Sequence, residues 1–218
     1  MAGLVVAMDG PSGSGKSSVS RGVARALGLR YLDTGAQYRA MTWWILRQGV
    51  DLADPAAIAS RCGEPEIVSG TDPGAPAIHV GGVDVSEPIR QDEVTSAVSA
   101  VAAVPEVRKR LVDLQRQIIG DGDIVVEGRD IGTVVAPGAQ VKIYLTASPE
   151  ARARRRSAEL TGTTAEAQQA AMARRDTLDS TRKTDPLSMA DGAVELDTTA
   201  LTLDEVIAEV LRLVKERT

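Results

Sequence analysis

A glycine-rich run near the start of the chain has the residue types and the spacing of a phosphate-binding loop. It matches G-x-x-x-x-G-K-S, follows a short apolar stretch and precedes a segment with helical spacing. Glycines there let successive backbone N–H groups turn inward at the positive end of a helix, where they bind an anion. Lys16 can then reach the β- and γ-phosphates of a nucleoside triphosphate, and the Ser17 hydroxyl can ligate Mg²⁺. We therefore expect ATP phosphates at Gly10, Pro11, Ser12, Gly13, Ser14, Gly15, Lys16, Ser17 and Ser18.

Such a P-loop alone does not separate kinases from ATPases and GTPases. The chain has no Asn-Lys-x-Asp run of the kind that selects guanine, which disfavours a GTPase. A motor or sensor ATPase usually needs more chain and more partner-binding surface than 218 residues supply. A kinase needs a second phosphate-binding site for its acceptor, so the rest of the sequence must be searched for one.

Two later segments place hydroxyls, arginines and carboxylates where a second anion could bind. The run Asp-Thr-Gly-Ala-Gln-Tyr-Arg puts Thr34 and Arg39 around the start of a predicted helix. The run Glu-Gly-Arg-Asp-Ile-Gly-Thr-Val-Val follows a buried apolar run and contributes Arg129 and Asp130. Its position predicts the carboxyl end of a strand, where α/β sheets bind ligands.

A third segment adds two more arginines. Arg175 and Arg182 are seven positions apart, which places them on one face if the segment is helical. Planar guanidinium groups bind phosphate oxygens in bidentate fashion, so arginines suit the dianion of a monophosphate. No Ser/His/Asp triad is evident, and phosphoryl transfer needs little covalent help beyond positioning and charge neutralisation.

These segments together resemble the bacterial cytidylate kinase family. The motifs D-T-G-A-x-Y-R, G-R-D-x-G-T-V-V and R-D-x-x-D-x-x-R occur in the family's order behind the P-loop, and the resemblance runs over essentially the whole chain. It implies Mg²⁺-dependent transfer of a phosphoryl group from ATP to CMP or dCMP. The open alternatives are another small-molecule kinase of the same fold, such as a UMP/CMP or AMP kinase, and a regulatory module that binds a nucleotide without transfer.

The resemblance also implies a role for each matched residue. Thr34, Arg39, Arg129 and Arg182 resemble the residues that hold the acceptor phosphate. Ser99, Arg108 and Asp130 resemble those that read the cytosine edge, while Arg175 and Asp179 resemble the pair that meets the ribose. The residues expected to act on the transferring group are Lys16, Arg129 and Arg182.

The predicted elements fit an α/β P-loop fold. Bounded apolar runs predict strands of a central parallel sheet at about residues 4–8, 29–33, 124–126, 141–145 and 193–196. Helical spacing predicts helices at about 17–27, 36–48, 91–103, 105–119, 149–160 and 164–178, after Asp54, and from Thr202. Residues 1–218 are expected to form one kinase domain with an antiparallel insertion at about 63–85. A short lid at about 149–162 would carry Arg152, Arg154, Arg155 and Arg156.

Composition and charge narrow the class of partner. The net charge of −5 disfavours a nucleic-acid polymer, whereas clustered arginines in an acidic protein favour small anions. No apolar stretch approaches the ~20 residues of a membrane helix. The single cysteine, Cys62, cannot form an internal disulfide. We therefore expect a cytoplasmic protein, and a monomer.

Overall fold

A five-stranded parallel sheet positions the loops named above. The computed structural model describes residues 3–159 and 164–218. Its main sheet has the order β2-β6-β1-β7-β8. The strands are β1 (Val5–Asp9), β2 (Arg30–Asp33), β6 (Ile124–Glu127), β7 (Val141–Thr146) and β8 (Val194–Asp197). Every neighbouring pair is parallel, so all five carboxyl ends meet at one edge. The predicted fold class is confirmed.

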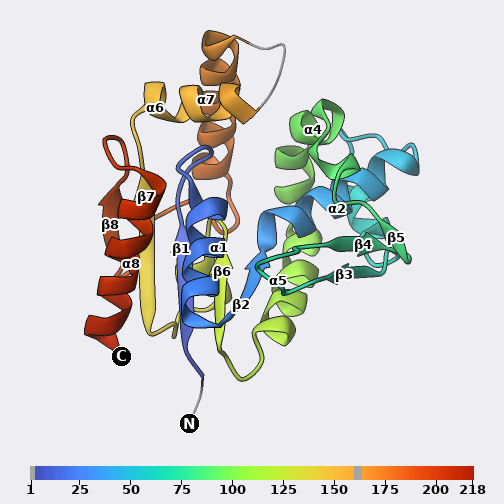
Figure 1. Ribbon diagram of the computed structural model, residues 1–218. Helices are drawn as coiled ribbons and strands as arrows, with labels where there is room; N and C mark the ends of the chain where they lie inside the picture. The colour runs from blue at the N-terminus through green and yellow to red at the C-terminus, as the bar shows by residue number, and fades with distance from the viewer. Residues whose placement is uncertain (1–2, 160–163) are drawn as a thin grey trace.

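Helices cover both faces of this sheet (Figure 1). Helices α1 (Lys16–Leu27) and α8 (Leu203–Arg217) pack against one face, where Val6 and Met8 of β1 belong to their core. On the other face Ala7 belongs to a core formed with α5 (Pro105–Ile119) and the short π-helix η2 (Ile131–Val135). Alternate residues of β1 thus face opposite layers, and both layers are apolar, as expected for a central strand of a parallel sheet.

A second lobe lies beside the sheet, next to β2 (Figure 1). It contains α2 (Thr34–Arg47), α3 (Pro55–Arg61), the 3₁₀-helix η1 (Pro88–Arg90) and α4 (Asp92–Ala102). It also holds an antiparallel sheet in the order β3-β4-β5, formed by β3 (Ile67–Ser69), β4 (Ile78–Val80) and β5 (Val83–Asp84). The predicted insertion is therefore present as an antiparallel sheet.

The hairpin between β4 and β5 turns at two glycines. Val80 pairs with Val83, which leaves Gly81 and Gly82 as a two-residue loop. Their φ values of 55° and 80° both lie in the left-handed region that glycine adopts without strain.

Two helices lie over the carboxyl edge of the main sheet, α6 (Pro149–Glu159) and α7 (Ala165–Thr181) (Figure 1). Helix α6 covers residues 149–159 of the predicted lid, and the lid's residues 160–162 fall outside the described part of the chain. Among the described residues, no helix has the length and apolar character needed to cross a membrane.

The π-helix η2 was not among the predicted elements. It begins where the buried Asp9 carboxylate accepts the backbone N–H groups of Ile131 and Gly132, both at 2.8 Å. Burial raises the pKa of Asp9 to about 6, although these two N–H groups favour its charged form. The carboxylate at the end of β1 thereby fixes the turn that follows Arg129 and Asp130.

Candidate functional site

A cavity of about 720 Å³ opens at the carboxyl edge of the sheet, between the P-loop, the second lobe and helices α6 and α7. Most of the predicted site residues line it. From the P-loop these are Ser12, Gly13, Ser14, Gly15, Lys16, Ser17 and Ser18. From the other segments they are Thr34, Arg39, Ser99, Arg108, Arg129, Asp130, Arg155, Arg156, Arg175, Asp179 and Arg182. Gly10, Pro11, Arg152 and Arg154 are not among the lining residues.

The P-loop connects β1 to α1 with backbone that requires glycine. Gly13 and Gly15 have φ values of 74° and 90°, and Gly15 is the cap of α1. At Gly10 a Cβ atom would overlap the carbonyl oxygen of Leu145, so only glycine lets the loop leave β1 beside β7. The loop therefore presents its backbone N–H groups at the positive end of a helix.

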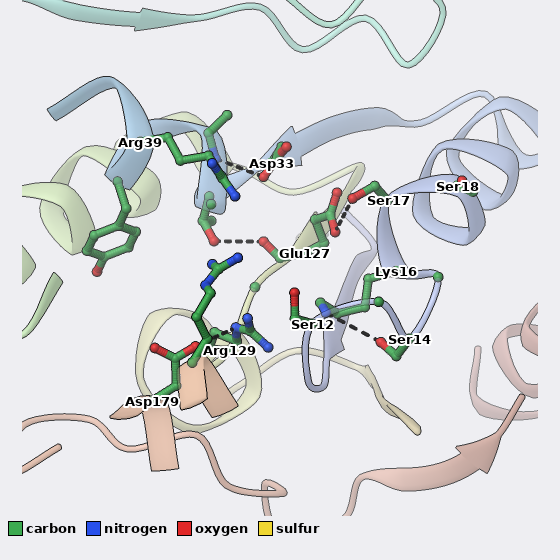
Figure 2. Close-up of a pocket in the computed structure, with 18 of the residues that line it drawn as sticks. Ser12, Ser14, Lys16, Ser17, Ser18, Asp33, Arg39, Glu127, Arg129 and Asp179 are labelled. Atoms are coloured by element: carbon green, nitrogen blue, oxygen red, sulfur yellow. Dashed lines mark hydrogen bonds and ion pairs between the residues drawn. The ribbon is translucent and has the colours of Figure 1, made fainter. Parts of the chain in front are cut away.

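Lys16 reaches across this loop (Figure 2). Its Nζ donates to the Pro11 carbonyl at 2.7 Å and to Ser14 Oγ at 3.4 Å. Desolvation, followed by the nearby Arg129 charge, lowers the pKa of Lys16 to about 7. Phosphate oxygens bound in the loop would favour the charged form of this ammonium. Binding of an anion would therefore offset the cost of burying the Lys16 charge.

Ser17 faces a buried carboxylate at the end of β6. Its Oγ donates to Glu127 Oε2 at 3.0 Å (Figure 2). The Tyr31 hydroxyl donates to the other carboxylate oxygen of Glu127. Burial and the nearby Asp33 raise the pKa of Glu127 to about 7. A hydroxyl and a carboxylate at the head of the P-loop are ligands of the kind that Mg²⁺ takes together with phosphate oxygens and water. The residues present therefore fit this metal.

Arginines gather at the end of the cavity away from the P-loop. Arg39 Nη1 donates to the Ile89 carbonyl at 3.1 Å and to Thr95 Oγ1 at 2.8 Å. Burial, then the charges of Arg175 and Arg156, lower the pKa of Arg39 to about 9. Burial, then the charge of Arg129, also lowers the pKa of Arg175. The positive charges of these arginines repel one another, and a bound anion would reduce this repulsion.

Arg108 and Asp130, predicted to read the base, form an ion pair of which each side chain is 5% exposed or less. Arg108 also donates through Nε to Asp185 Oδ2 at 2.7 Å. Its guanidinium carbon lies 5.3 Å from the centre of the Tyr38 ring, and Tyr38 lines the cavity. Burial raises the pKa of Asp130, while Arg108 opposes the shift. The pair presents a fixed donor and a fixed acceptor to the cavity.

Asp179, predicted to meet the ribose, forms an ion pair with Arg129. Its Oδ2 lies 3.1 Å from Arg129 Nε. Within the described part of the chain, Nε of Arg175 is buried without a hydrogen-bond partner. The predicted pair thus lines the cavity as a carboxylate that contacts Arg129 and an arginine whose buried Nε has no hydrogen-bond partner among the described residues.

The four predicted lid arginines have different environments. Arg155 donates to Thr198 and lines the cavity together with Arg156. Arg152 instead binds the outer side of the P-loop, through the Ser12 carbonyl at 3.0 Å. Arg154 is exposed. Arg152, Arg155 and Arg156 of α6 thus contact the P-loop or line the cavity, while Arg154 is exposed to solvent.

Several lining residues had no assigned role in the sequence analysis. Glu127 is the first residue of the quoted Glu-Gly-Arg-Asp motif. An acidic residue at the end of a buried strand is the feature that could have indicated its role, and this strand pairs with β1. Asp33 and Tyr38 lie within the quoted Asp-Thr-Gly-Ala-Gln-Tyr-Arg run, beside Thr34 and Arg39, and both line the cavity. An apolar part of the cavity wall near Thr198 consists of Leu201, Leu203 and Val206. The sequence indicated only that a helix begins at Thr202, and not that these residues line a cavity.

The chain matches known proteins over nearly its full length. The family model described as cytidylate kinase matches residues 6–216. A cytidylate kinase of Streptomyces avermitilis is 60% identical, covering 98% of this chain and 94% of that protein. One from Nocardia farcinica is 59% identical, with 98% and 94% covered. One from Mycobacterium leprae is 55% identical, with 100% and 98% covered.

Solved structures show the same fold at low identity. An uncharacterised protein of Eubacterium ventriosum superposes with a TM-score of 0.54 at 10% identity, covering 98% of this chain and 99% of that one. A sugar kinase of a Janibacter species gives 0.50 at 14% identity, covering 98% and 95%. The fold is thus shared beyond recognisable sequence likeness. With the family model and these relatives matched over nearly all of its length, the chain belongs to the cytidylate kinase family.

Proposed function

We propose that this chain transfers the γ-phosphoryl group of ATP to CMP or dCMP, giving ADP and CDP or dCDP, in an Mg²⁺-dependent reaction. One observation carries the proposal beyond family membership. A single cavity is lined at one end by a P-loop with Lys16 and at the other by arginines beside the buried Arg108–Asp130 pair. A protein that only binds ATP has no use for this second anion site.

At the donor end, the P-loop N–H groups and Lys16 hold the phosphates of ATP. Lys16 is a mobile charge on a flexible stem, so it can follow the γ-phosphoryl group as that group moves toward the acceptor. Bound Mg²⁺ would be held by Ser17, with Glu127 beside it, and supplies charge neutralisation at the donor phosphates.

At the acceptor end, Asp130 accepts a hydrogen bond from the exocyclic amine of cytosine, and Arg108 donates to its carbonyl. Ser99 lies on α4 at the same cavity wall. Uracil presents a carbonyl where cytosine has the amine. Opposite a carboxylate, UMP would therefore leave two acceptors facing each other without a proton, at a cost of several kcal/mol.

Between the two ends, arginines place the attacking phosphate and neutralise charge. Thr34, Arg39, Arg129 and Arg182 hold the acceptor monophosphate so that one of its oxygens attacks the γ-phosphorus in line with the leaving ADP oxygen. The transition state spreads negative charge over the equatorial oxygens, and Lys16, Arg129 and Arg182 stabilise it. Arg155 and Arg156 of α6 enclose the site from above and limit water access.

The test is whether ADP forms only when CMP or dCMP is supplied. A regulatory nucleotide-binding module would release no ADP under either condition, and an ATPase would release ADP without an acceptor. The expected cytoplasmic location and monomeric state, as well as the single domain over residues 1–218, remain predictions from the sequence.

The ribose assignment gives a prediction about sugar selectivity. If Asp179 accepts a hydrogen bond from the 2′-hydroxyl, replacing it with alanine should penalise CMP more than dCMP, because deoxyribose lacks that hydroxyl. We expect the ratio of kcat/KM for CMP to that for dCMP to fall roughly 5- to 150-fold. This change corresponds to a loss of about 1–3 kcal/mol of transition-state stabilisation that is specific to CMP.

Steady-state kinetics with both acceptors at saturating ATP measure this ratio. Asp179 also pairs with Arg129, and loss of that contact lowers the activity on both acceptors alike. The dCMP series is therefore the internal control. Equal losses on the two acceptors would make Asp179 a partner of Arg129 alone.

A further inference from the structure

A carboxylate with no role in the proposed chemistry fixes the P-loop from outside. Asp176 of α7 accepts the Ser12 backbone N–H through Oδ1 at 3.1 Å. Its Oδ2 pairs with Arg152 of α6, which also donates to the Ser12 carbonyl at 3.0 Å. One ion pair between α6 and α7 thus binds both backbone polar groups of Ser12. Charge-assisted hydrogen bonds of this kind are among the stronger ones in proteins.

The contact lies behind the loop and not in the space that phosphates would fill. Ser12 and Gly13 line the cavity, whereas Asp176 and Arg152 are not among its lining residues. A Cβ atom at Gly13 would lie 3.1 Å from both Arg152 Cβ and Met172 Sδ, so the loop packs closely against α6 and α7. Asp176 therefore supports the P-loop without competing for its anion.

The same helix carries the proposed ribose pair, one position before and three positions after Asp176. Arg129 connects the two sites. Its Nε lies 3.1 Å from Asp179, while its Nη1 donates to the Gly10 carbonyl at 2.9 Å and lies 3.6 Å from Asp176 Oδ1. When Arg129 turns to the acceptor phosphate and Asp179 to the ribose, the three contacts of Arg129 with Asp179, Gly10 and Asp176 are given up. The Asp176–Arg152 pair then remains as the link between α7 and the P-loop.

We propose that Asp176 is a positioning residue that couples acceptor binding to the geometry of the P-loop. The inference rests on the proposed function, because CMP must bind at Arg175 and Asp179 for α7 to be held by the acceptor. Acceptor contacts fix α7, α7 fixes Asp176, and Asp176 with Arg152 fixes Ser12 in its phosphate-binding conformation. Occupancy of the acceptor site therefore tightens donor binding, and by linkage donor occupancy tightens acceptor binding equally.

The experiment measures the Kd of Mg²⁺–adenylyl imidodiphosphate, a non-hydrolysable ATP analogue, by isothermal titration calorimetry with and without saturating CMP. In the parent protein we expect CMP to tighten analogue binding by at least about 5-fold. In Asp176→Ala, which removes both contacts and favours the helix, we expect the ratio of the two Kd values to fall below about 2-fold. CMP should still bind the variant, since its own contacts remain.

The control is Glu166→Ala, which removes one negative charge from an exposed position in the first turn of the same helix and should keep the parent ratio. Arg152→Gln removes the α6 partner of Asp176 and should also bring the ratio of the two Kd values below about 2-fold. This variant provides the test if Asp176→Ala does not fold. CMP that binds the parent without changing the Kd of the analogue overturns this inference alone, as does an undiminished ratio in either variant. CMP that fails to bind the parent overturns the proposed function itself.

Discussion

Replacing Lys16 with alanine is expected to lower kcat on the order of 10³-fold while the protein remains folded. The ammonium lies within the P-loop, against the Pro11 carbonyl and Ser14, and lines the cavity. It can follow the transferring group, so its charge is worth most in the transition state, where charge spreads over the phosphoryl oxygens. Steady-state ADP formation with saturating ATP and CMP measures the loss.

The same variant should not lose stability. In the unliganded protein the pKa of Lys16 is lowered to about 7, below that of an exposed lysine, so keeping the ammonium charged at neutral pH opposes folding. Alanine removes this cost, and we expect an equal or higher Tm without nucleotide. Lys109→Ala, which removes the same charge from an exposed position on α5, should keep full activity. A folded Lys16→Ala protein with near-parent kcat would rule out the proposed role.

Replacing Asp130 with asparagine is expected to lower kcat/KM for CMP by a factor on the order of 10² to 10³. The amide keeps the shape of the carboxylate but removes the charge that accepts from the cytosine amine and pairs with Arg108. The affinity for an ATP analogue without CMP should change little, because Asp130 lies at the acceptor end. Acceptor kinetics and donor calorimetry on the one variant separate these effects.

Asp185→Asn is the matched control for this change. Asp185 holds the same arginine through Nε at 2.7 Å but is not among the residues that line the cavity. Its φ of 49° is one that asparagine tolerates, so the backbone is retained. We expect a much smaller loss than in Asp130→Asn. Equal losses would mean that Asp130 only orients Arg108, and normal CMP kinetics in Asp130→Asn would contradict base reading by this residue.

The sequence predicted the architecture because its signals are local. The P-loop stands between an apolar run and a helical pattern, Gly81 and Gly82 specify a two-residue turn, and Thr202 with Glu205 forms a capping box at the start of the helix predicted from Thr202. These features depend on residues a few positions apart, which fixes the type and order of the elements. The cavity then follows from the parallel sheet, because its carboxyl ends meet at one edge.

The interactions that the sequence could not predict join residues far apart in the chain. Asp9 fixes η2 from 122 positions away, and Ser12 meets Asp176 across 164. Gln37 occupies a fully buried position on α2, where it donates to Ser69 Oγ in β3 at 3.0 Å. A motif match brings residues such as Arg108 and Asp130 into one site, but their pairing becomes visible only in three dimensions.

The central claim is that the cavity selects a cytosine monophosphate as phosphoryl acceptor, and a panel of acceptors tests it most directly. With ATP and Mg²⁺ held constant, kcat/KM is measured by ADP formation for CMP, dCMP, UMP and AMP, with a reaction without acceptor as the blank. The account predicts that CMP and dCMP exceed UMP and AMP by at least about 10²-fold, the scale set by a buried polar mismatch, with no ADP in the blank. A preference for UMP or AMP, or ADP formed without any acceptor, would contradict it.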